Sequence, residues 1–379
     1  MKRRDLLLFS AGGVLAAAGA GAWWAATREP VTALAPWGAA ELDASDARIF
    51  TFAHAILAPN PHNRQPWLIR LTGEDRAEIR CDLGKRLPVT DPFDRQIAIG
   101  FGCFLELARQ AAAERGVRLE IEPFPEGEPQ PRLDGRPIAR LRFVPDAAAR
   151  RDPLFAHIRA RRSLKEPFDT AKPVEAGTLA RLLATPLAGV AAAGSVEPAR
   201  VAALRDLTWR AWRIEALDRA AFGESVELMR IGKAEIERAP DGIDLGGPLF
   251  EGLNRLGLMT RTTLADPSSI AFKEGWRAYE SVMTTSMGFV WLTTQGNSRA
   301  EQLAAGAAHV RLNLAAAGLG MGLHPVSQAL QEYAAMAGPF AEAAALASGG
   351  RVQMLSRIGY APAVPPSPRW PLAAKLEKA

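Results

Sequence analysis

The first residues that could do chemistry form a short stretch stiffened by prolines. It reads A-P-N-P-H-N-R-Q-P-W and runs from Ala58 to Trp67. Proline fixes the backbone and removes an N–H donor, so the side-chain amides of Asn60, Asn63 and Gln65 point in few directions. A planar ligand with polar edges needs such preset donors and acceptors. The stretch predicts a binding loop for such a ligand or, alternatively, a helix–strand connection built on Asx turns.

The second group is a run of cationic and hydroxyl residues. Arg161, Arg162, Ser163 and Lys165 fall within five positions. Guanidinium forks match phosphate oxygens bidentately, and a serine adds a further donor. This run predicts a phosphate site. The alternative is structural, because cations also favour the negative end of a helix.

Other chemistries find little support. The five histidines are scattered and form no Cys/His cluster with metal-ligand spacing, so we expect no metal site. Cys81 and Cys103 fall in apolar stretches, which predicts buried thiols, although an oxidising compartment would also permit a disulfide. The chain has 379 residues and a formal net charge of +5, without a basic stripe carrying interleaved aromatics. We therefore expect no nucleic-acid partner.

The N-terminus has the pattern of an export signal. Lys2, Arg3 and Arg4 precede an uncharged run from Leu6 to Ala26. The adjacent arginines resemble a twin-arginine signal, which predicts the twin-arginine translocase as a partner and the periplasm as the destination. An ordinary secretion signal is the alternative. The run is long enough to remain as a membrane anchor.

Cleavage of this signal is left open by the sequence. Ala33-Leu34-Ala35 has the small-x-small form of a cleavage site, but the unfavourable Pro36 follows it.

Helices and strands must position the two groups. We expect a helix from Asp46 to Ala58, a strand hairpin turning at Gly73, and strands at 117–121, 138–144, 287–293 and 352–358. Apolar spacing predicts helices at 95–115, 175–183 and 299–319, with a largely helical stretch at 201–238. The expected divisions are a signal or anchor at 1–26, a linker at 27–45, a first half at 46–150 and a second half at 151–379. An insert at about 201–269 lies within the second half.

The two long Ala-rich helices suggest an internal repeat. Gly102 precedes Gly116, and Gly306 precedes Gly320, by the same number of positions, with three alanines at matching offsets. Duplication is one interpretation. Two unrelated core helices that both need small residues for close packing are the other.

Both groups resemble motifs of the nitroreductase superfamily. The proline loop is similar to its A-P-S-x-x-N-x-Q-P-W segment, which packs on the flavin ring; the resemblance implies an FMN site at Pro59, Asn60 and Pro61, with Asn63 bonding the pyrimidine ring. The run at 161–165 is similar to its R-R-S opening. That likeness implies that Arg161, Arg162, Ser163 and Lys165 hold the FMN phosphate.

Two weaker matches follow from the same resemblance. Ser327 and Gln328 come after a G-L-G helix end, which implies a place near the reactive N5 edge of the flavin. Near the C-terminus, S-P-R-W-P is similar to the family's closing segment. This likeness implies that Arg369 returns to the phosphate.

The order of the motifs is reversed relative to ordinary family members. Here the Q-P-W loop belongs to the first half and the R-R-S run to the second, so one complete site would form between them. With the export signal, this looks like the Acg-like branch. The resemblance implies an α+β, nitroreductase-like fold of two fused half-units, a pseudo-dimer. Each half would have a mixed, mainly antiparallel sheet flanked by helices, with the insert as a lid over the flavin.

The implied activity is that of a flavin-dependent oxidoreductase. Electrons would pass from NAD(P)H or a redox partner through FMN to a small nitroaromatic or quinone-like acceptor. No catalytic residue is assigned. One alternative is a protein that only binds or sequesters FMN beneath a closed lid. Another is an exported scaffold that binds no flavin.

Overall fold

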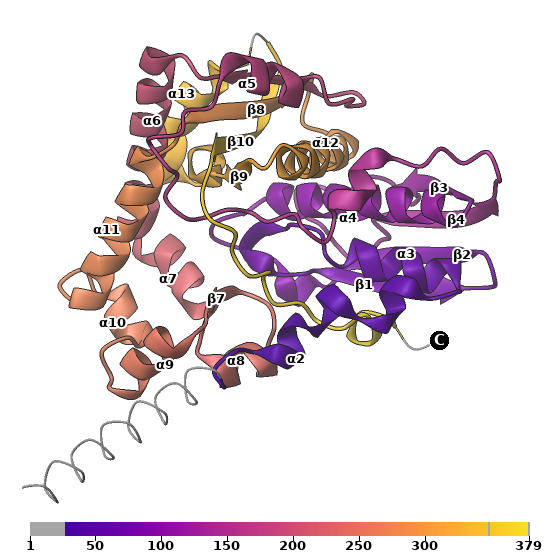
Figure 1. The fold of residues 1–379 in the computed structure, drawn as a ribbon, viewed down its shortest axis with the longest axis horizontal. Coiled ribbons are helices and arrows are strands. Elements are labelled where there is room, and N and C mark those ends of the chain that lie inside the picture. The colour runs from indigo at the N-terminus through magenta and orange to yellow at the C-terminus, as the bar shows by residue number, and fades with distance from the viewer. Residues whose placement is uncertain (1–26, 348, 378–379) are drawn as a thin grey trace, which may run out of the picture.

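The computed structural model describes residues 27–347 and 349–377 and contains two similar sheets (Figure 1). The first sheet has the strand order β1-β2-β4-β3, with every neighbouring pair antiparallel. Its strands are β1 (Trp67–Thr72), β2 (Arg76–Cys81), β3 (Val117–Pro123) and β4 (Ala139–Pro145). Helices α3 (Ala47–Ala55) and α4 (Arg95–Glu114) pack on it through a shared apolar core.

The second sheet repeats this order as β5-β8-β10-β9, again antiparallel throughout. Its strands are β5 (Ala191–Ser195), β8 (Gly288–Thr294), β9 (Gly322–Pro325) and β10 (Arg351–Gly359). Around it lie α5 (Ala176–Leu183), α12 (Arg299–Gly318) and α13 (Ala337–Ala344). In both halves the first, second, fourth and third strands in chain order are neighbours, with the long helix after the second. The predicted α+β fold of two half-units is confirmed: the named strands of both sheets are antiparallel, and an isolated parallel bridge adds to each sheet.

The two long helices cross at their glycines. A Cβ on Gly102 would lie 2.0 Å from the Leu303 carbonyl oxygen, and one on Gly306 would lie 1.9 Å from that of Ile99. The two contacts mirror each other, since Ile99 and Leu303 each precede their glycine by three positions. Glycine is therefore required at both positions for the backbones to approach this closely.

The first arginine of each helix also reaches into the other half. Arg95 donates to the carbonyl groups of Leu330 and Gln353, at 2.7 and 2.8 Å. Arg299 donates to those of Pro129 and Pro131, both at 3.0 Å. Each helix thus satisfies carbonyl groups of the opposite half: Leu330, Pro129 and Pro131 lie between the last two strands of their half, and Gln353 lies in β10. The two halves are therefore held together by hydrogen bonds that each donates to the other.

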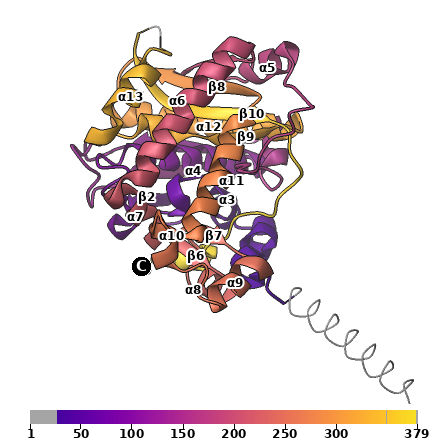
Figure 2. The same cartoon turned by 90° about the vertical axis from the view of Figure 1, so that its left-hand side faces the viewer.

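A mainly helical insert covers one face of both halves, where α6 and α11 run side by side (Figure 2). Trp212 of α6 lies between Trp276 and Tyr279 of α11, with ring centroids 5.4 and 4.6 Å away. The insert comprises α6 (Pro198–Leu217), α7 (Arg219–Glu227), β6 (Met229–Ile231), α8 (Lys233–Arg238), β7 (Ile243–Leu245), α9 (Pro248–Arg255), α10 (Arg261–Ala265) and α11 (Ile270–Thr284). Its core joins residues of the second sheet, so it is firmly attached to that half.

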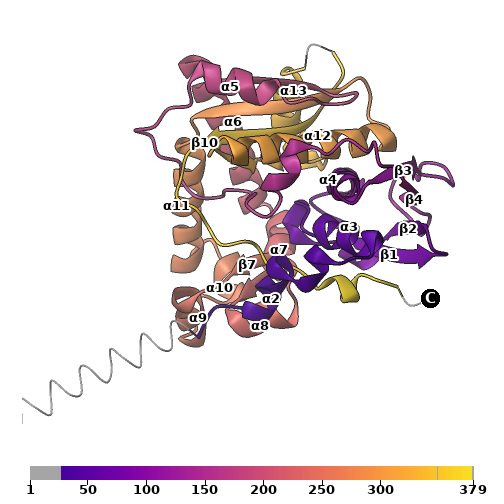
Figure 3. The ribbon, with the colours of Figure 1, turned by 45° about the vertical axis from the view of Figure 1, so that its right-hand side comes forward.

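The segment expected as a linker, 27–45, contains α2 (Val31–Leu34) and two 3₁₀ turns. It lies against the C-terminal tail, where the Arg369 N–H donates to the Ala33 carbonyl at 2.8 Å. The tail then continues to the first sheet and forms a parallel bridge between Leu376 and Ile69 (Figure 3).

Within the part of the chain that the structure describes, no helix is long and apolar enough to cross a membrane. The predicted signal at 1–26 lies outside those residues. Both cysteines are buried and free, as the preferred interpretation of the sequence expected.

Candidate functional site

The proline loop has an unusual backbone. His62, Asn63 and Gln65 have φ values of 49°, 51° and 49°, in the left-handed region that non-glycine residues rarely adopt. Each such residue stores of the order of 1 kcal/mol, which the surroundings must offset. The Gln65 N–H donates to Asn60 Oδ1 at 2.7 Å, and the buried Gln65 amide donates to the Pro240 carbonyl at 2.6 Å. The loop is therefore held in one conformation from within and by the insert.

Asn63 faces the C-terminal tail. Its Nδ2 donates to the Pro368 carbonyl at 2.9 Å, and its Oδ1 accepts from Arg369 at 2.7 Å. A side-chain amide has two donor hydrogens and two acceptor lone pairs. One of each remains for a ligand. The proline loop and the tail thus form one unit, although more than three hundred residues separate them.

Two arginines predicted from different motifs meet at the end of α3. Arg161 donates to the Leu57 carbonyl at 3.1 Å. Arg369 donates to the carbonyl groups of Ile56, Leu57 and Ala58, at 3.1 to 3.2 Å. These carbonyls lie at or beyond the C-terminus of α3, where a helix leaves oxygens unpaired. Part of the cluster's role is therefore structural, at the C-terminal end of the helix that the sequence predicted from Asp46 to Ala58.

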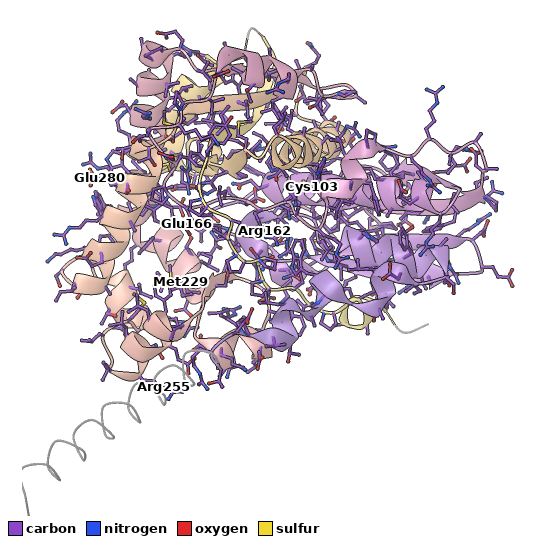
Figure 4. The ribbon with its side chains drawn as sticks, viewed as in Figure 1. Cys103, Arg162, Glu166, Met229, Arg255 and Glu280 are labelled. Atoms are coloured by element: carbon purple, nitrogen blue, oxygen red, sulfur yellow. The ribbon has the colours of Figure 1, made fainter. Side chains whose placement is uncertain are left out.

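Arg162 lies beside these two residues, where the tail crosses the centre of the molecule (Figure 4). Its Nε donates to the Val364 carbonyl at 3.2 Å, and its guanidinium lies 4.9 Å from the ring centroid of Trp37. Arg369 lies 5.3 Å from the same ring. Trp37, from the 27–45 segment, therefore covers the cluster on one side.

The positive charge of this cluster is only partly offset, through the electrostatic interaction of Arg369 with Asp244. Among the described residues, no ion pair involves Arg161, Arg162 or Arg369, and the Arg161 Nε is buried without a hydrogen-bond partner. Burial lowers the pKa of Arg161 to about 10. Burial and the neighbouring Arg161 charge lower the pKa of Arg369 to about 9. Buried cations of this kind are costly unless an anion accompanies them. The residues present therefore fit a phosphate-sized anion.

Ser163 and Lys165 differ in their surroundings. Ser163 forms a parallel bridge with Leu323 of β9, and so extends the second sheet. Lys165 is exposed, and its charge acts on both loops. Burial, with the Lys165 charge, lowers the pKa of His62 to about 4. Burial, with the charges of Arg357 and Lys165, also depresses that of His324. The charge of Lys165 therefore acts both on His62 of the proline loop and on His324 of β9.

Ser327 and Gln328 begin a 3₁₀ turn after β9 (Ser327–Leu330). Gln328 is coupled to Glu215 of α6 and lowers its pKa, although burial dominates and raises the value to about 7. Glu215 also accepts from Gln331 at 3.1 Å and from Ser225 at 3.3 Å. Its carboxyl group thus joins the insert to the turn that carries the predicted residues.

The same network continues into the first half. Ser225 Oγ lies 3.0 Å from His62 Nε2. The chain Glu215–Ser225–His62 therefore links both predicted loops through the insert. We did not identify Glu215, Ser225 or Trp37 from the sequence, because each stands in an ordinary helical or linker pattern. Only their distant partners distinguish them.

A second anchor of the insert is Asp241. This buried carboxylate is hydrogen-bonded to Lys85, pairs with Arg230 at 3.0 Å and accepts from Trp370 Nε1 at 3.3 Å. Burial alone would raise the pKa of Asp241, but the Lys85 hydrogen bond and charge hold it below its usual value. The insert is therefore held closed over the proline loop.

Two residues of the insert combine solvent exposure with raised pKa values. Solvent reaches Tyr279 and Asp244, of which Tyr279 is 38% exposed. Burial nonetheless raises the pKa of Tyr279 to about 12 and that of Asp244 above its ordinary value. The charges of Lys165 and Arg369 act on Asp244 in the opposite direction and lower its pKa in part.

Comparisons with known proteins give fold resemblances only. No family model matches the sequence, and no curated protein matches it. Three similar solved structures can be compared. A nitroreductase-like family protein from Bacillus cereus is 16% identical, with 61% of this chain and 97% of that chain covered and a TM-score of 0.33. The FMN-dependent nitroreductase NfnB from Mycobacterium smegmatis, in complex with NADPH, is 14% identical, with coverage of 59% and 96% and a TM-score of 0.34. A nitroreductase with bound FMN from Bacteroides fragilis is 13% identical, with coverage of 56% and 89% and a TM-score of 0.31.

Proposed function

We propose that this protein binds FMN between its two half-units and is a flavin-dependent oxidoreductase of the Acg-like type. The observation that carries the proposal is the cluster of buried, unpaired guanidinium groups beside Asn63. Arg161, Arg162, Ser163 and Lys165 would hold the phosphate with Arg369. The loop at 59–63 would lie along the ring, and Ser327 with Gln328 at its opposite edge.

The chemistry would belong to the cofactor. When bound, FMN would accept either a hydride from a reduced nicotinamide or electrons from a redox partner, and would pass electrons on to a nitroaromatic or quinone-like acceptor. The protein supplies position and charge. The cations of the cluster and Lys165 would stabilise the anionic reduced flavin. Trp37 and the insert would exclude water from the phosphate end of the site.

A spectrum of the purified protein tests flavin binding. We expect the absorbance bands of oxidised FMN, and their loss in Arg161→Ala combined with Arg162→Ala. Arg151→Ala, which removes an exposed arginine elsewhere, is the control and should keep them. A protein that is colourless and takes up no added FMN would contradict the proposal.

A second candidate is a protein that sequesters FMN without turnover. The closed insert favours it, since Asp241 and the His62–Ser225 contact fasten the insert over the loop. NADPH separates the two candidates. Bleaching of the flavin, followed by reoxidation with a nitro compound or quinone, supports the oxidoreductase. Flavin that dithionite reduces but no nicotinamide reduces supports sequestration.

We further propose export by the twin-arginine translocase to the periplasm, with the N-terminal segment retained as an anchor. Ala33 of the possible cleavage site is buried and bonded to Arg369, which disfavours cleavage there. Changing Arg3→Lys together with Arg4→Lys should leave the protein in the cytoplasm of a host with this translocase. Cell fractionation measures the distribution, and a double variant that still reaches the periplasm would contradict this route.

A further inference from the structure

One end of the insert exposes an apolar stripe. Leu249, Leu253 and Leu256 follow a spacing of four and then three residues along and just beyond α9, so they share one side. Leu249 is 67% exposed and Leu256 73% exposed. Leu258, in the next turn, is 58% exposed. An amphipathic helix normally turns this side towards the core, but here it faces outward.

Other exposed apolar residues lie at the same end of the molecule. Ile270, at the start of α11, is 78% exposed, and Val31 of α2 is 63% exposed. The ribbon views agree that α2, α9 and the first turn of α11 gather at this end (Figures 1 and 3). We call Val31, Leu249, Leu256, Leu258 and Ile270 the α9 face. Clustered exposed apolar groups of this kind mark a contact surface.

The described chain begins directly beside this face. The Thr27 carbonyl accepts from Lys233 at 3.2 Å, and Arg28 pairs with Glu251 of α9 at 2.9 Å. Arg255, on the same helix, lies at the end of the molecule where the ribbon starts (Figure 4). The uncharged run from Leu6 to Ala26 ends one residue before Thr27. As a helix it would measure about 30 Å, the thickness of a bilayer's hydrocarbon core.

We propose that the α9 face rests on the surface of the lipid bilayer in which the run from Leu6 to Ala26 is inserted. This inference depends on the anchor proposed above. Because Thr27 and Arg28 are fastened to the insert, an inserted run would keep the α9 face permanently beside the lipid. That proximity gives the lipid a high effective concentration at the α9 face, which favours the membrane over any soluble partner. Leucine and isoleucine side chains at the headgroup boundary gain the transfer free energy that drives interfacial binding.

The experiment places an environment-sensitive fluorophore on the face. Cys81 and Cys103 are buried, so a cysteine introduced by Leu256→Cys is the one that reacts with a maleimide dye in the folded protein. Glu122→Cys, on exposed β3 of the first half, is the matched control. Both full-length variants are reconstituted with vesicles of phosphatidylcholine and phosphatidylglycerol carrying brominated acyl chains, which quench on contact.

We expect the dye at position 256 to emit at shorter wavelength and to be quenched, whereas the dye at 122 emits as in water and is not quenched. If protein floats with the vesicles but position 256 behaves like 122, the inference is wrong. A shift that appears in detergent without lipid and grows with protein concentration assigns the face to a second copy, and also overturns it. Failure to float removes the anchor itself, while the bound flavin, measured separately, is unaffected.

Discussion

Among the described residues, Arg161 and Arg369, like Arg299 and Arg357, are buried without a carboxylate in an ion pair. Their backbone partners explain why they are tolerated: carbonyl oxygens at the end of α3 receive their N–H groups. Carbonyls are weaker partners than a carboxylate, so an excess of positive charge remains. A phosphate would remove that excess, which is why ligand binding and stability should be coupled at these residues.

Arg161→Met tests this coupling. We expect the flavin-free variant to be more stable than the flavin-free wild type by about 1 kcal/mol, because a desolvated charge is replaced by an apolar side chain of similar length. Stabilisation by added FMN should disappear in the variant. Urea unfolding with and without FMN measures both. Equal stabilisation of the two proteins by FMN would show that Arg161 does not contact the ligand.

Glu215 predicts a pH dependence of stability. Its pKa is raised by burial to about 7 in the folded protein, from about 4.5 in an unfolded chain. The folded state therefore binds more protons between these values, so stability should be full below about pH 4.5 and fall as the pH rises towards 7. The loss should be about 3 kcal/mol, and Glu215→Gln should remove it.

Urea midpoints at pH 5 and pH 8 measure this effect. Glu342→Gln, on the exposed side of α13, is the control and should keep the wild-type dependence. An unchanged pH dependence in Glu215→Gln would exclude Glu215 as its source.

Among the elements, α4 and α12 were predicted best. Their observed ends lie within one residue of the expected ones, because long apolar patterns and caps coincide there. β5 was not predicted, since its Ala-Ala-Ala-Gly-Ser sequence has no strand preference and only its pairing with β8 makes it a strand. Likewise, the individual helices α9, α10 and α11 of the insert were not predicted, and tertiary packing decides where they begin and end.

The helix crossing gives a prediction about its glycines. Gly102→Ala should destabilise the protein by about 3 kcal/mol, because the new Cβ would meet the rigid Leu303 carbonyl. Gly177→Ala, also within a helix but with open space around its Cα, should stabilise by up to about 1 kcal/mol. Thermal unfolding compares them. Similar values for the two variants would mean that the helices can separate without cost.

The insert's docking depends on Asp241. Asp241→Asn should lower the free energy of local unfolding of the insert by about 3 kcal/mol, because Lys85 and Arg230 would lose their carboxylate partner. Hydrogen exchange should then increase in β6 and β7, and reduction of the flavin by NADPH should become faster if the closed insert limits access. Asp266→Asn, exposed on the same insert, is the control. Unchanged exchange in both would show that other contacts keep the insert closed.

At the scale of the whole molecule, the sequence predicted that neither half holds a complete site, from the reversed order of two motifs. The structure brings Arg161 of the second motif to the end of α3, next to the loop of the first motif. Arg369 was expected near the phosphate, but the roles of Trp37 and of the tail beyond Arg369 could not be predicted. Trp37 and Leu376 acquire their roles only through partners hundreds of residues away.

The route of the tail has a consequence for biosynthesis. Arg369 and Lys375, which complete the surroundings of Asn63 and Gln65, are synthesised about three hundred residues after them. Until these residues are synthesised, the proline loop of the first half therefore lacks their hydrogen bonds. Cofactor capture would follow synthesis of this tail, and a quality check on export that senses the bound cofactor would also report that the tail is in place.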